Sequence, residues 1–392
     1  MKRAFLFRPT SSLPLVAAGT GLIAATYGLI RLAYGLFLPE VQDDLALGVG
    51  AAGAISGGAS VVYCAGALVG FLLATRHARA LVIAAATSAA IGASGMAAAQ
   101  GTVSFAVFAI GSSAGAGLAS PALVAVLQRN PSTRRRPQAQ TIVNAGTGPG
   151  LVAAGVLALV LLPNWRLAWL LAAIFTVTVA VLVLLTDRGP AAAPARQSLP
   201  PPSWFAAHGS VLAAALLMGG GSAAVWNYGR TFLVESGAGQ TVSVTAWIAL
   251  GAGGTAVIAT ARWMERRGPH AAWAVTVGTL ALASAALAAA PGSAPLALAA
   301  CAAFGWGYTA ATGALIAWTA QIDPARAPAG AALLFITLIL GQALGAAAVG
   351  GVIAAAGYPV TFLGAAVTSA IAAAPALQGL KAGSADRLAP HR

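Results

Sequence analysis

The chain has 392 residues, of which 59% are hydrophobic and only 7% are charged, whereas soluble globular proteins carry about 25% charged residues. This composition excludes a soluble protein, because so much apolar surface cannot be hidden from water in a chain of this length. The net charge of +13 does not indicate nucleic-acid binding, since the basic residues are scattered at the ends of apolar runs. Cys64 and Cys301 lie in separate apolar segments, which argues against a disulfide framework or a zinc site.

Apolar runs long enough to cross a bilayer, which takes ~20 residues per helix, follow one another along the whole chain. The first run follows the basic start "MKRAFLFRPT" and is too long for a signal-peptide core, so we expect it to be a retained span. Because every backbone polar group must be satisfied within lipid, the predicted fold class is an all-α membrane protein. Its twelve predicted spans are 13–38, 50–74, 80–100, 103–127, 139–162, 166–186, 206–233, 240–262, 271–290, 294–320, 329–356 and 358–378.

The placement of the basic residues supports this count. With the N-terminus in the cytoplasm and alternating spans, 18 of the 21 Lys and Arg residues fall in cytoplasmic segments, as the positive-inside rule requires. The other three, Arg31, Arg166 and Arg230, lie in or beside the outer half of the membrane. We therefore expect a multi-pass protein of the inner cell membrane with both termini in the cytoplasm.

A Pro- and Ala-rich stretch, "TDRGPAAAPARQSLPPPSW", separates the sixth span from the seventh. The two sets of six spans contain similar segments at equivalent positions, since "YGLFLPE" (34–40) ends the first span and "YGRTFLVE" (228–235) ends the seventh. Parallel six-span repeats are typical of transporters that bind substrate between the repeats. The predicted organisation is a cytoplasmic N-terminus (1–12), an N-terminal bundle (13–186), a cytoplasmic linker (187–205), a C-terminal bundle (206–378) and a cytoplasmic tail (379–392).

Two short motifs at equivalent places in the halves resemble the cytoplasmic signature of the major facilitator superfamily, which runs roughly G-x-L-A-D-R-x-G-R-R. The first copy, "GFLLATRHAR" (70–79), retains Gly70 and Arg79 but has Ala74 in place of the acid and His77 in place of the second glycine. The second copy, "ARWMERRGPH" (261–270), retains the acid, an arginine and the glycine, as Glu265, Arg266 and Gly268.

This resemblance covers nearly the whole chain and implies two pseudo-symmetric six-helix bundles that expose a central cavity to alternate sides. It also implies a cytoplasmic latch in which a carboxylate bracketed by arginines holds helix ends together. The residues that would form this latch are Gly70, Arg79, Glu265, Arg266 and Gly268. Alternatively, these arginines only set the topology.

The fifth span contains "NAGTGPGLVAAG" (144–155), in which Gly148-Pro149 weakly resembles the antiporter signature of drug exporters. Asn144 stands where that signature has a glycine, and Val152 and Ala153 replace its later glycine pair. Gly and Pro in a membrane helix also permit close packing or a bend, which is the simpler interpretation here.

Polar and aromatic residues mark a candidate cavity. Tyr27, Arg31 and Tyr34 share one face of a regular helix, and the resemblance implies that spans one, four, seven and ten surround the cavity. The candidate substrate-binding residues are Arg31, Tyr27, Tyr34, Asn144, Trp226, Asn227, Arg230, Trp306 and Tyr308. Two guanidiniums suit a carboxylate, sulfonate or phosphate. Alternatively, Arg31 and Arg230 pair with acids at the outer rim, namely Glu40, Asp43, Asp44 or Glu235.

All eight acidic residues fall outside the predicted spans, whereas a proton-coupled carrier of cations usually buries a titrating carboxylate. We therefore predict a secondary transporter of a small organic anion or amphipathic metabolite. A broad-specificity efflux pump and a non-transporting receptor or scaffold stay open as alternatives. No metalloprotease motif, intramembrane acid pair or serine–histidine set indicates an enzyme. We expect no cofactor and a monomer, while the coupling proton or counter-anion and the direction of transport stay open.

Overall fold

The computed structural model describes residues 13–134, 138–189 and 200–376, and within these ranges every element of regular secondary structure is a helix. Ten helices of the described chain are long and apolar enough to cross a membrane, and two of them are long enough to cross it twice, which makes twelve crossings. These helices confirm the all-α membrane class and agree with the predicted count.

The two double crossings are α3 (Val49–Ala98) and α14 (Ala327–Ile371). At ~1.5 Å per residue the 50 residues of α3 would measure about 75 Å if straight, more than twice the ~30 Å hydrocarbon core. Non-helical backbone divides each of them, at His77 (φ −127°, ψ 31°) in α3 and at Gly357 (φ 78°, ψ 173°) in α14. Gly357 needs a positive φ that only glycine adopts without strain, so it allows a bend almost without a loop.

The first crossing is not the regular helix that the sequence analysis assumed. It consists of α1 (Leu13–Ile23), a π-helix η1 (Ala24–Leu32) and α2 (Ala33–Leu45). Within η1, a Cβ atom on Gly28 would come within 2.6 Å of the backbone of Gly150. The absence of a side chain at position 28 therefore lets η1 pack directly against α7 (Thr147–Leu161).

The predicted fifth span is also divided. The short helix α6 (Gln138–Asn144) is separated from α7 by a turn at residues 145–146. Pro149 lies in the first turn of α7, where its missing N–H leaves no intrahelical bond unmade. The glycine and proline residues of this segment thus accompany a break in the helix.

The remaining elements are continuous helices or short connections. Before the linker these are α4 (Thr102–Arg129), α5 (Pro131–Arg134) and α8 (Trp165–Thr186). After it follow α9 (Pro202–Ala207), α10 (Gly209–Glu235), α11 (Gln240–Arg267), α12 (Pro269–Ala289), α13 (Ala294–Ile322) and the 3₁₀ turn η2 (Pro324–Arg326).

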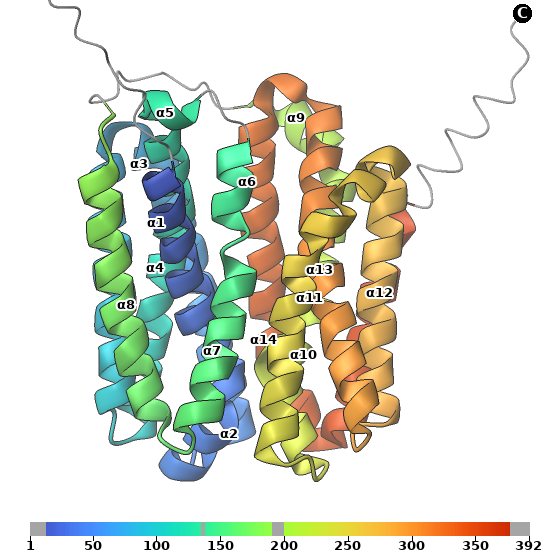
Figure 1. The fold of residues 1–392 in the computed structure, drawn as a ribbon. Helices are drawn as coiled ribbons and strands as arrows, with labels where there is room; N and C mark the ends of the chain where they lie inside the picture. The colour runs from blue at the N-terminus through green and yellow to red at the C-terminus, as the bar shows by residue number, and fades with distance from the viewer. Residues whose placement is uncertain (1–12, 135–137, 190–199, 377–392) are drawn as a thin grey trace, which may run out of the picture.

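Two groups of helices stand side by side (Figure 1). We call the elements α1 to α8 the N half and α9 to α14 the C half. The halves meet along α2 and α10, along α3 and α14, and along α7 and α11. A site between the halves is therefore lined by helices that lie far apart in the sequence.

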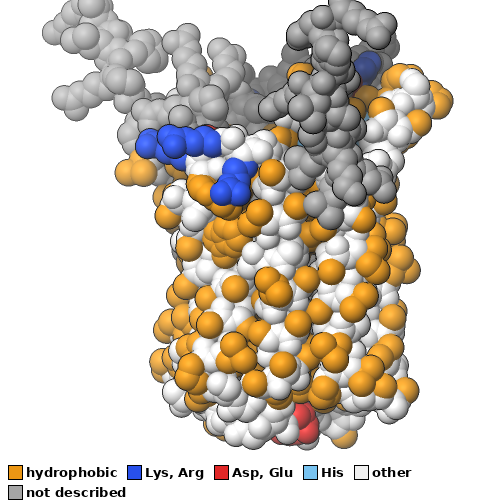
Figure 2. Space-filling model, turned by 90° about the vertical axis from the view of Figure 1, so that its right-hand side faces the viewer, with side chains coloured by type: hydrophobic (Ala, Val, Ile, Leu, Met, Phe, Trp, Pro, Cys, Tyr) orange, Lys and Arg blue, Asp and Glu red, His pale blue; other side chains and the backbone are white. Residues whose placement is uncertain are grey.

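The outer surface is apolar over most of its height, and the charged side chains visible from this side lie near the two ends (Figure 2). Leu185 and Leu282, for example, are 71% and 74% exposed, as expected for side chains that face lipid. We call the end that carries Arg79, Arg129 and Arg266 the basic end, and the end that carries Glu40 and Glu235 the acidic end. This surface is that of a multi-pass membrane protein.

Parts of the predicted organisation fall outside the described residues. These parts are the N-terminal segment 1–12, residues 190–199 of the linker and the tail 379–392. The limits assigned to the domains stay predictions.

Candidate functional site

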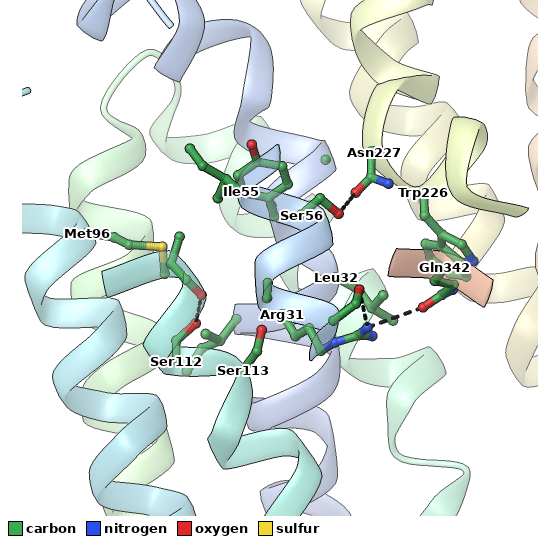
Figure 3. Close-up of a pocket in the computed structure, with 16 residues that line it drawn as sticks. Arg31, Leu32, Ile55, Ser56, Met96, Ser112, Ser113, Trp226, Asn227 and Gln342 are labelled. Atoms are coloured by element: carbon green, nitrogen blue, oxygen red, sulfur yellow. Dashed lines mark hydrogen bonds between the residues drawn. The ribbon is translucent and has the colours of Figure 1, made fainter. Parts of the chain in front are cut away.

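A small cavity lies between the halves, with a volume of about 40 Å³ open to the centres of water-sized molecules (Figure 3). It occupies the half of the molecule nearer the acidic end, because its lining comes from η1, α2, both crossings of α3, α4, the end of α10 and the first crossing of α14. The lining residues are Ile30, Arg31, Leu32, Tyr34, Gly35, Ile55, Ser56, Ala59, Ser60, Met96, Ala109, Ser112, Ser113, Trp226, Asn227 and Gln342. Arg31 is the only charged side chain among them.

Arg31 extends from the end of η1 into this cavity. Its Nη2 donates hydrogen bonds to Oε1 of Gln342 (3.2 Å) and to Oγ of Ser60 (3.4 Å). The guanidinium also lies over the ring of Tyr63, 4.8 Å from its centroid. The Nε–H is buried and has no acceptor in the described part of the chain. Because a buried donor without a partner costs about 1–3 kcal/mol, this atom marks a place where a ligand oxygen would stabilise the protein.

The two tyrosines predicted beside Arg31 have different surroundings. Tyr34 belongs to the cavity lining, but its hydroxyl donates to the backbone oxygen of Ala52 (2.9 Å). Tyr27 does not belong to the lining, and its hydroxyl shares a hydrogen bond with that of Tyr63 (2.8 Å). Tyr27 therefore supports the ring on which Arg31 rests.

The C half supplies an aromatic wall. The ring of Trp226 packs edge-to-face against Tyr308, with centroids 5.1 Å apart, and against Phe304 and Trp247. Its indole Nε1–H is buried and, among the described residues, finds no acceptor. Asn227 closes the cavity toward α3, because its Oδ1 accepts a hydrogen bond of 2.5 Å from the hydroxyl of Ser56.

Gln342 is a central polar residue of the site, and the sequence analysis did not select it. It is 5% exposed, and its Nε2 donates to the hydroxyl of Tyr308 (2.9 Å) and to Oγ of Ser222 (3.5 Å). The signal in the sequence is a lone amide within the apolar run "LILGQALG". Tyr63 and Ser60 were missed for the same reason, since single polar residues in apolar runs are common.

The second predicted arginine lies outside the cavity lining. Arg230 is 2% exposed and forms a bidentate ion pair with Glu40, at 2.5 and 2.6 Å. Its Nη1 also donates to the backbone oxygen of Leu36 (2.5 Å), and its Nε donates to the hydroxyl of Ser243 (3.3 Å). The sequence analysis considered substrate binding and pairing with a rim acid for Arg230. In the structure Arg230 is paired with an acid, Glu40, near the acidic end.

Two other candidates also lie away from the lining. Asn144 is exposed on α6, where its Oδ1 accepts a hydrogen bond from Gln140. Trp306 donates its indole N–H to Thr260 (2.9 Å) within the C half. Four predicted residues therefore lie together around the cavity, namely Arg31, Tyr34, Trp226 and Asn227. Tyr308 lies behind them and is hydrogen-bonded to the lining residue Gln342. Asn144 and Trp306 lie away from the cavity.

The residues proposed for a latch are divided between two places. Arg79 contacts Asp187 (3.5 Å), whose buried carboxylate also accepts from Arg129 and Asn130. Gly70 packs against Pro121 within the N half.

The C-half latch residues lie at the end of α11. Glu265 and Arg266 are exposed and have no ion-pair partner within the described ranges, and Gly268 ends α11 with a φ of 73°. The acid missing from the first motif copy at Ala74 thus has a counterpart from another helix, Asp187, inside the N half.

The comparisons with known proteins agree on the fold. A family model described as Major Facilitator Superfamily matches residues 20–333. No curated protein sequence matches the chain. Similar solved structures include the nucleoside transporter NupG, a bacterial homolog of the human lysosomal transporter Spinster in an inward-facing and unoccupied conformation, and a D-xylose-proton symporter.

These structures resemble the whole chain at low sequence identity. NupG is 17% identical with a TM-score of 0.75, and the match covers 94% of this chain and 99% of that one. For the Spinster homolog the values are 17%, 0.72, 99% and 100%, and for the symporter 14%, 0.69, 91% and 96%. At such identities the likeness shows the fold alone.

Proposed function

We propose, because the chain belongs to the Major Facilitator Superfamily, that it is a secondary transporter that moves a small organic anion across the membrane by alternating access. The family and the solved structures of similar fold are those of transporters rather than enzymes. The family does not specify the substrate, so we infer the class of substrate from the cavity.

The observation that carries the proposal is the charge of the lining. Among the described residues that line the cavity, Arg31 has the only charged side chain and none is acidic. Its Nη2 is bonded only to the neutral oxygens of Gln342 and Ser60, and its buried Nε has no acceptor among the described residues. A cation would be repelled here, whereas an anion would gain charge-assisted hydrogen bonds.

The remainder of the lining favours a substrate with an apolar body. Ile30, Leu32, Ile55, Met96 and Trp226 surround the cavity, and burial of apolar ligand surface against them is favourable by roughly 25 cal/mol per Å². The charged group of the substrate would lie at Arg31 in the N half, and its body would face the aromatic wall in the C half.

The pattern of contacts between the halves supports alternating access by two bundles that move against each other. Hydrogen bonds join the halves at Arg31 and Gln342, at Ser56 and Asn227, at Cys64 and Ile336, and at Val49 and Tyr228. These contacts, like the Arg230–Glu40 pair, lie in the middle of the bundle or nearer the acidic end. We infer that the acidic end is closed and faces outward, with the basic end in the cytoplasm.

A broad-specificity exporter of apolar compounds is the second candidate. The cluster of Trp226, Trp247, Phe304 and Tyr308 favours it, because aromatic walls bind many planar molecules without directional contacts. In that case Arg31 would only join the halves, and a panel of uncharged aromatic compounds would be transported as well as the anions. A non-transporting receptor or scaffold has no specific observation in its favour.

The test is transport in proteoliposomes that contain the purified protein. A panel of labelled monocarboxylates, sulfonates, phosphate esters and uncharged aromatic compounds is offered to wild type and to Arg31→Ala. We expect flux of organic anions, and we expect Arg31→Ala to lower it by about tenfold or more, because a hydrogen bond to a charged group contributes about 1.5–3 kcal/mol.

Arg166→Ala is the matched control, since Arg166 pairs with Asp44 at the acidic end and does not line the cavity. Its flux should equal that of wild type once protein amounts are matched. Equal flux in the Arg31→Ala variant, or transport restricted to uncharged compounds, would exclude the anion carrier.

A further inference from the structure

The side of the Arg31 guanidinium that carries Nε and Nη2 is only half occupied. In arginine these two N–H groups point in the same direction and together match the two oxygens of one carboxylate. Here Nη2 donates to the amide oxygen of Gln342, while the adjacent Nε is buried without an acceptor in the described residues. The acceptors of Nη2 are thus two neutral oxygens, that of Gln342 and that of Ser60, and the Nε position is unfilled among the described residues.

The same protein contains this geometry with both positions filled. Arg129 binds the carboxylate of Asp187 side-on, with Nε donating to Oδ1 (3.2 Å) and Nη2 donating to Oδ2. The partner of Arg129 is a carboxylate that accepts from both Nε and Nη2, whereas Arg31 has a carboxamide and a hydroxyl that accept from Nη2 alone. We use the Arg129–Asp187 pair as the template for the occupied state of Arg31.

We propose that the transported anion carries a carboxylate, that this carboxylate displaces the amide oxygen of Gln342 from Arg31, and that Gln342 is thereby the residue that couples binding to the contact between the halves. The inference rests on the proposed function, since it names the charged group of the substrate and the residue with which it competes.

The orientation of the Gln342 side chain is fixed by its other end. Its Nε2 donates to Tyr308 (2.9 Å) on α13 and to Ser222 (3.5 Å) on α10. With the amide nitrogen bonded to these two hydroxyls, the amide oxygen is the end of the side chain that faces Arg31 in this structure. Gln342 therefore connects three helices of the C half to Arg31, the one charged residue of the lining. Figure 3 shows its hydrogen bond with Arg31.

The exchange is favourable on physical grounds. A carboxylate would accept from both Nε and Nη2 with charge assistance, whereas the amide oxygen accepts from Nη2 alone and carries no charge. Gln342 would keep its two donated hydrogen bonds to Tyr308 and Ser222. The net result is that the direct link between Arg31 and α14 is replaced by the ligand, so that loading the cavity removes one of the hydrogen bonds that join the halves.

The position also selects among ligands. A planar carboxylate matches the two coplanar N–H groups, and a carboxamide or alcohol of the same body offers no charge that would outcompete Gln342. Gln342 thus positions the ligand and selects for charge. An uncharged ligand would replace the neutral amide oxygen of Gln342 by another neutral group and would gain no binding free energy.

The experiment measures ligand-induced thermal stabilisation of the purified full-length chain, which grows with ligand concentration relative to Kd. The probes are aliphatic and aromatic monocarboxylates, each with its matching sulfonate and carboxamide. The variants are Gln342→Glu, which places a tethered carboxylate at Arg31, and Gln342→Met, which removes the competing oxygen and keeps the volume. Gln100→Glu, an exposed residue near the acidic end, is the matched control.

We expect the best monocarboxylate to stabilise wild type and Gln100→Glu alike, and its sulfonate and carboxamide to stabilise them less. Gln342→Glu should weaken binding of the carboxylate ligand by tenfold or more, because the introduced glutamate pairs with the guanidinium of Arg31. The Tm of this variant without ligand should not fall. Gln342→Met should bind the carboxylate at least as tightly as wild type, and its transport rate in proteoliposomes should rise, because this link no longer holds the unloaded halves together.

The outcomes separate this inference from the proposed function. Carboxylate binding by Gln342→Glu that equals wild type, or a Gln342→Met variant with unchanged transport rate, overturns the role of Gln342 and leaves the anion carrier intact. Equal stabilisation by sulfonates overturns the carboxylate assignment alone. Stabilisation by none of the anions overturns the proposed function as well.

Discussion

Arg230 on α10 and Glu40 on α2 form a two-fold hydrogen-bonded ion pair that joins the halves near the acidic end. The arginine side chain is 1% exposed and the glutamate 17%. A pair that is so well removed from water depends strongly on both partners, because either one alone is a buried charge without compensation. The pair therefore ties α2 to α10, and the proposed alternating access requires it to separate when this end opens.

Glu40→Gln should lower the stability of this closed form. The variant leaves Arg230 buried beside a neutral amide, at a cost of about 3–5 kcal/mol for breaking a buried pair from one side. Thermal denaturation followed by tryptophan fluorescence measures the effect. Asp44→Asn is the control at the same end, because it removes an exposed pair with Arg166 that contributes about 0–1 kcal/mol.

The exchange Glu40→Arg with Arg230→Glu tests the pair itself. We expect each single change to lower Tm and the double exchange to recover part of the loss, since opposite charges again face each other. Equal values of Tm for Glu40→Gln and Asp44→Asn would contradict the role given to the buried pair.

Arg31→Lys should separate charge from geometry in the cavity. Lysine keeps the positive charge but lacks the planar fork of donors, so we expect Kd for the best carboxylate to rise by roughly tenfold. The measurement is a titration by ligand-induced thermal shift, with Arg79→Lys as the control outside the cavity. A variant that binds as tightly as wild type would show that only the charge matters.

Asp187→Asn should destabilise the basic end of the N half. The carboxylate has no exposed surface and accepts hydrogen bonds from Arg129 and Asn130, while Arg79 lies 3.5 Å away. Its neutralisation leaves Arg129 without a charged partner, so we expect a loss of about 3–5 kcal/mol. Because the Arg79 side chain is 53% exposed, Arg79→Gln should lower Tm clearly less, and an equal fall in both variants would disprove the ranking.

Gly35→Ala should obstruct the approach of α2 to α10. A Cβ atom at position 35 would lie 2.0 Å from the backbone oxygen of Trp226, which cannot rotate away. We expect the variant to lose most of its maximal transport rate because the halves cannot close at this height. Gly50→Ala is the matched control, since a Cβ there meets no atom within 4 Å, and it should transport at the rate of wild type.

Much of the fold could be predicted because it depends on local composition. The bilayer requires runs of ~20 apolar residues with basic residues at their ends, so the crossings and their number can be read along the chain. The π-helix η1 and the break between α6 and α7 could not be read in this way. Close backbone approaches accompany both features, at Gly28 and Gly150 for η1 and at Gly146 and Thr20 for the break, and such contacts join residues more than one hundred positions apart.

In the candidate site, too, some residues could be predicted from the sequence and others could not. Arg31 was recognisable from the sequence, because a charge within an apolar span is costly and is retained only for a reason. The sequence by itself thus determined that the chain is a helical membrane transporter with a cation inside its first crossing. Only the tertiary structure decided that Gln342 contacts this cation, that Arg230 pairs with Glu40, and that Asn144 lies elsewhere, because each of these depends on which side chains from distant helices come within hydrogen-bonding distance.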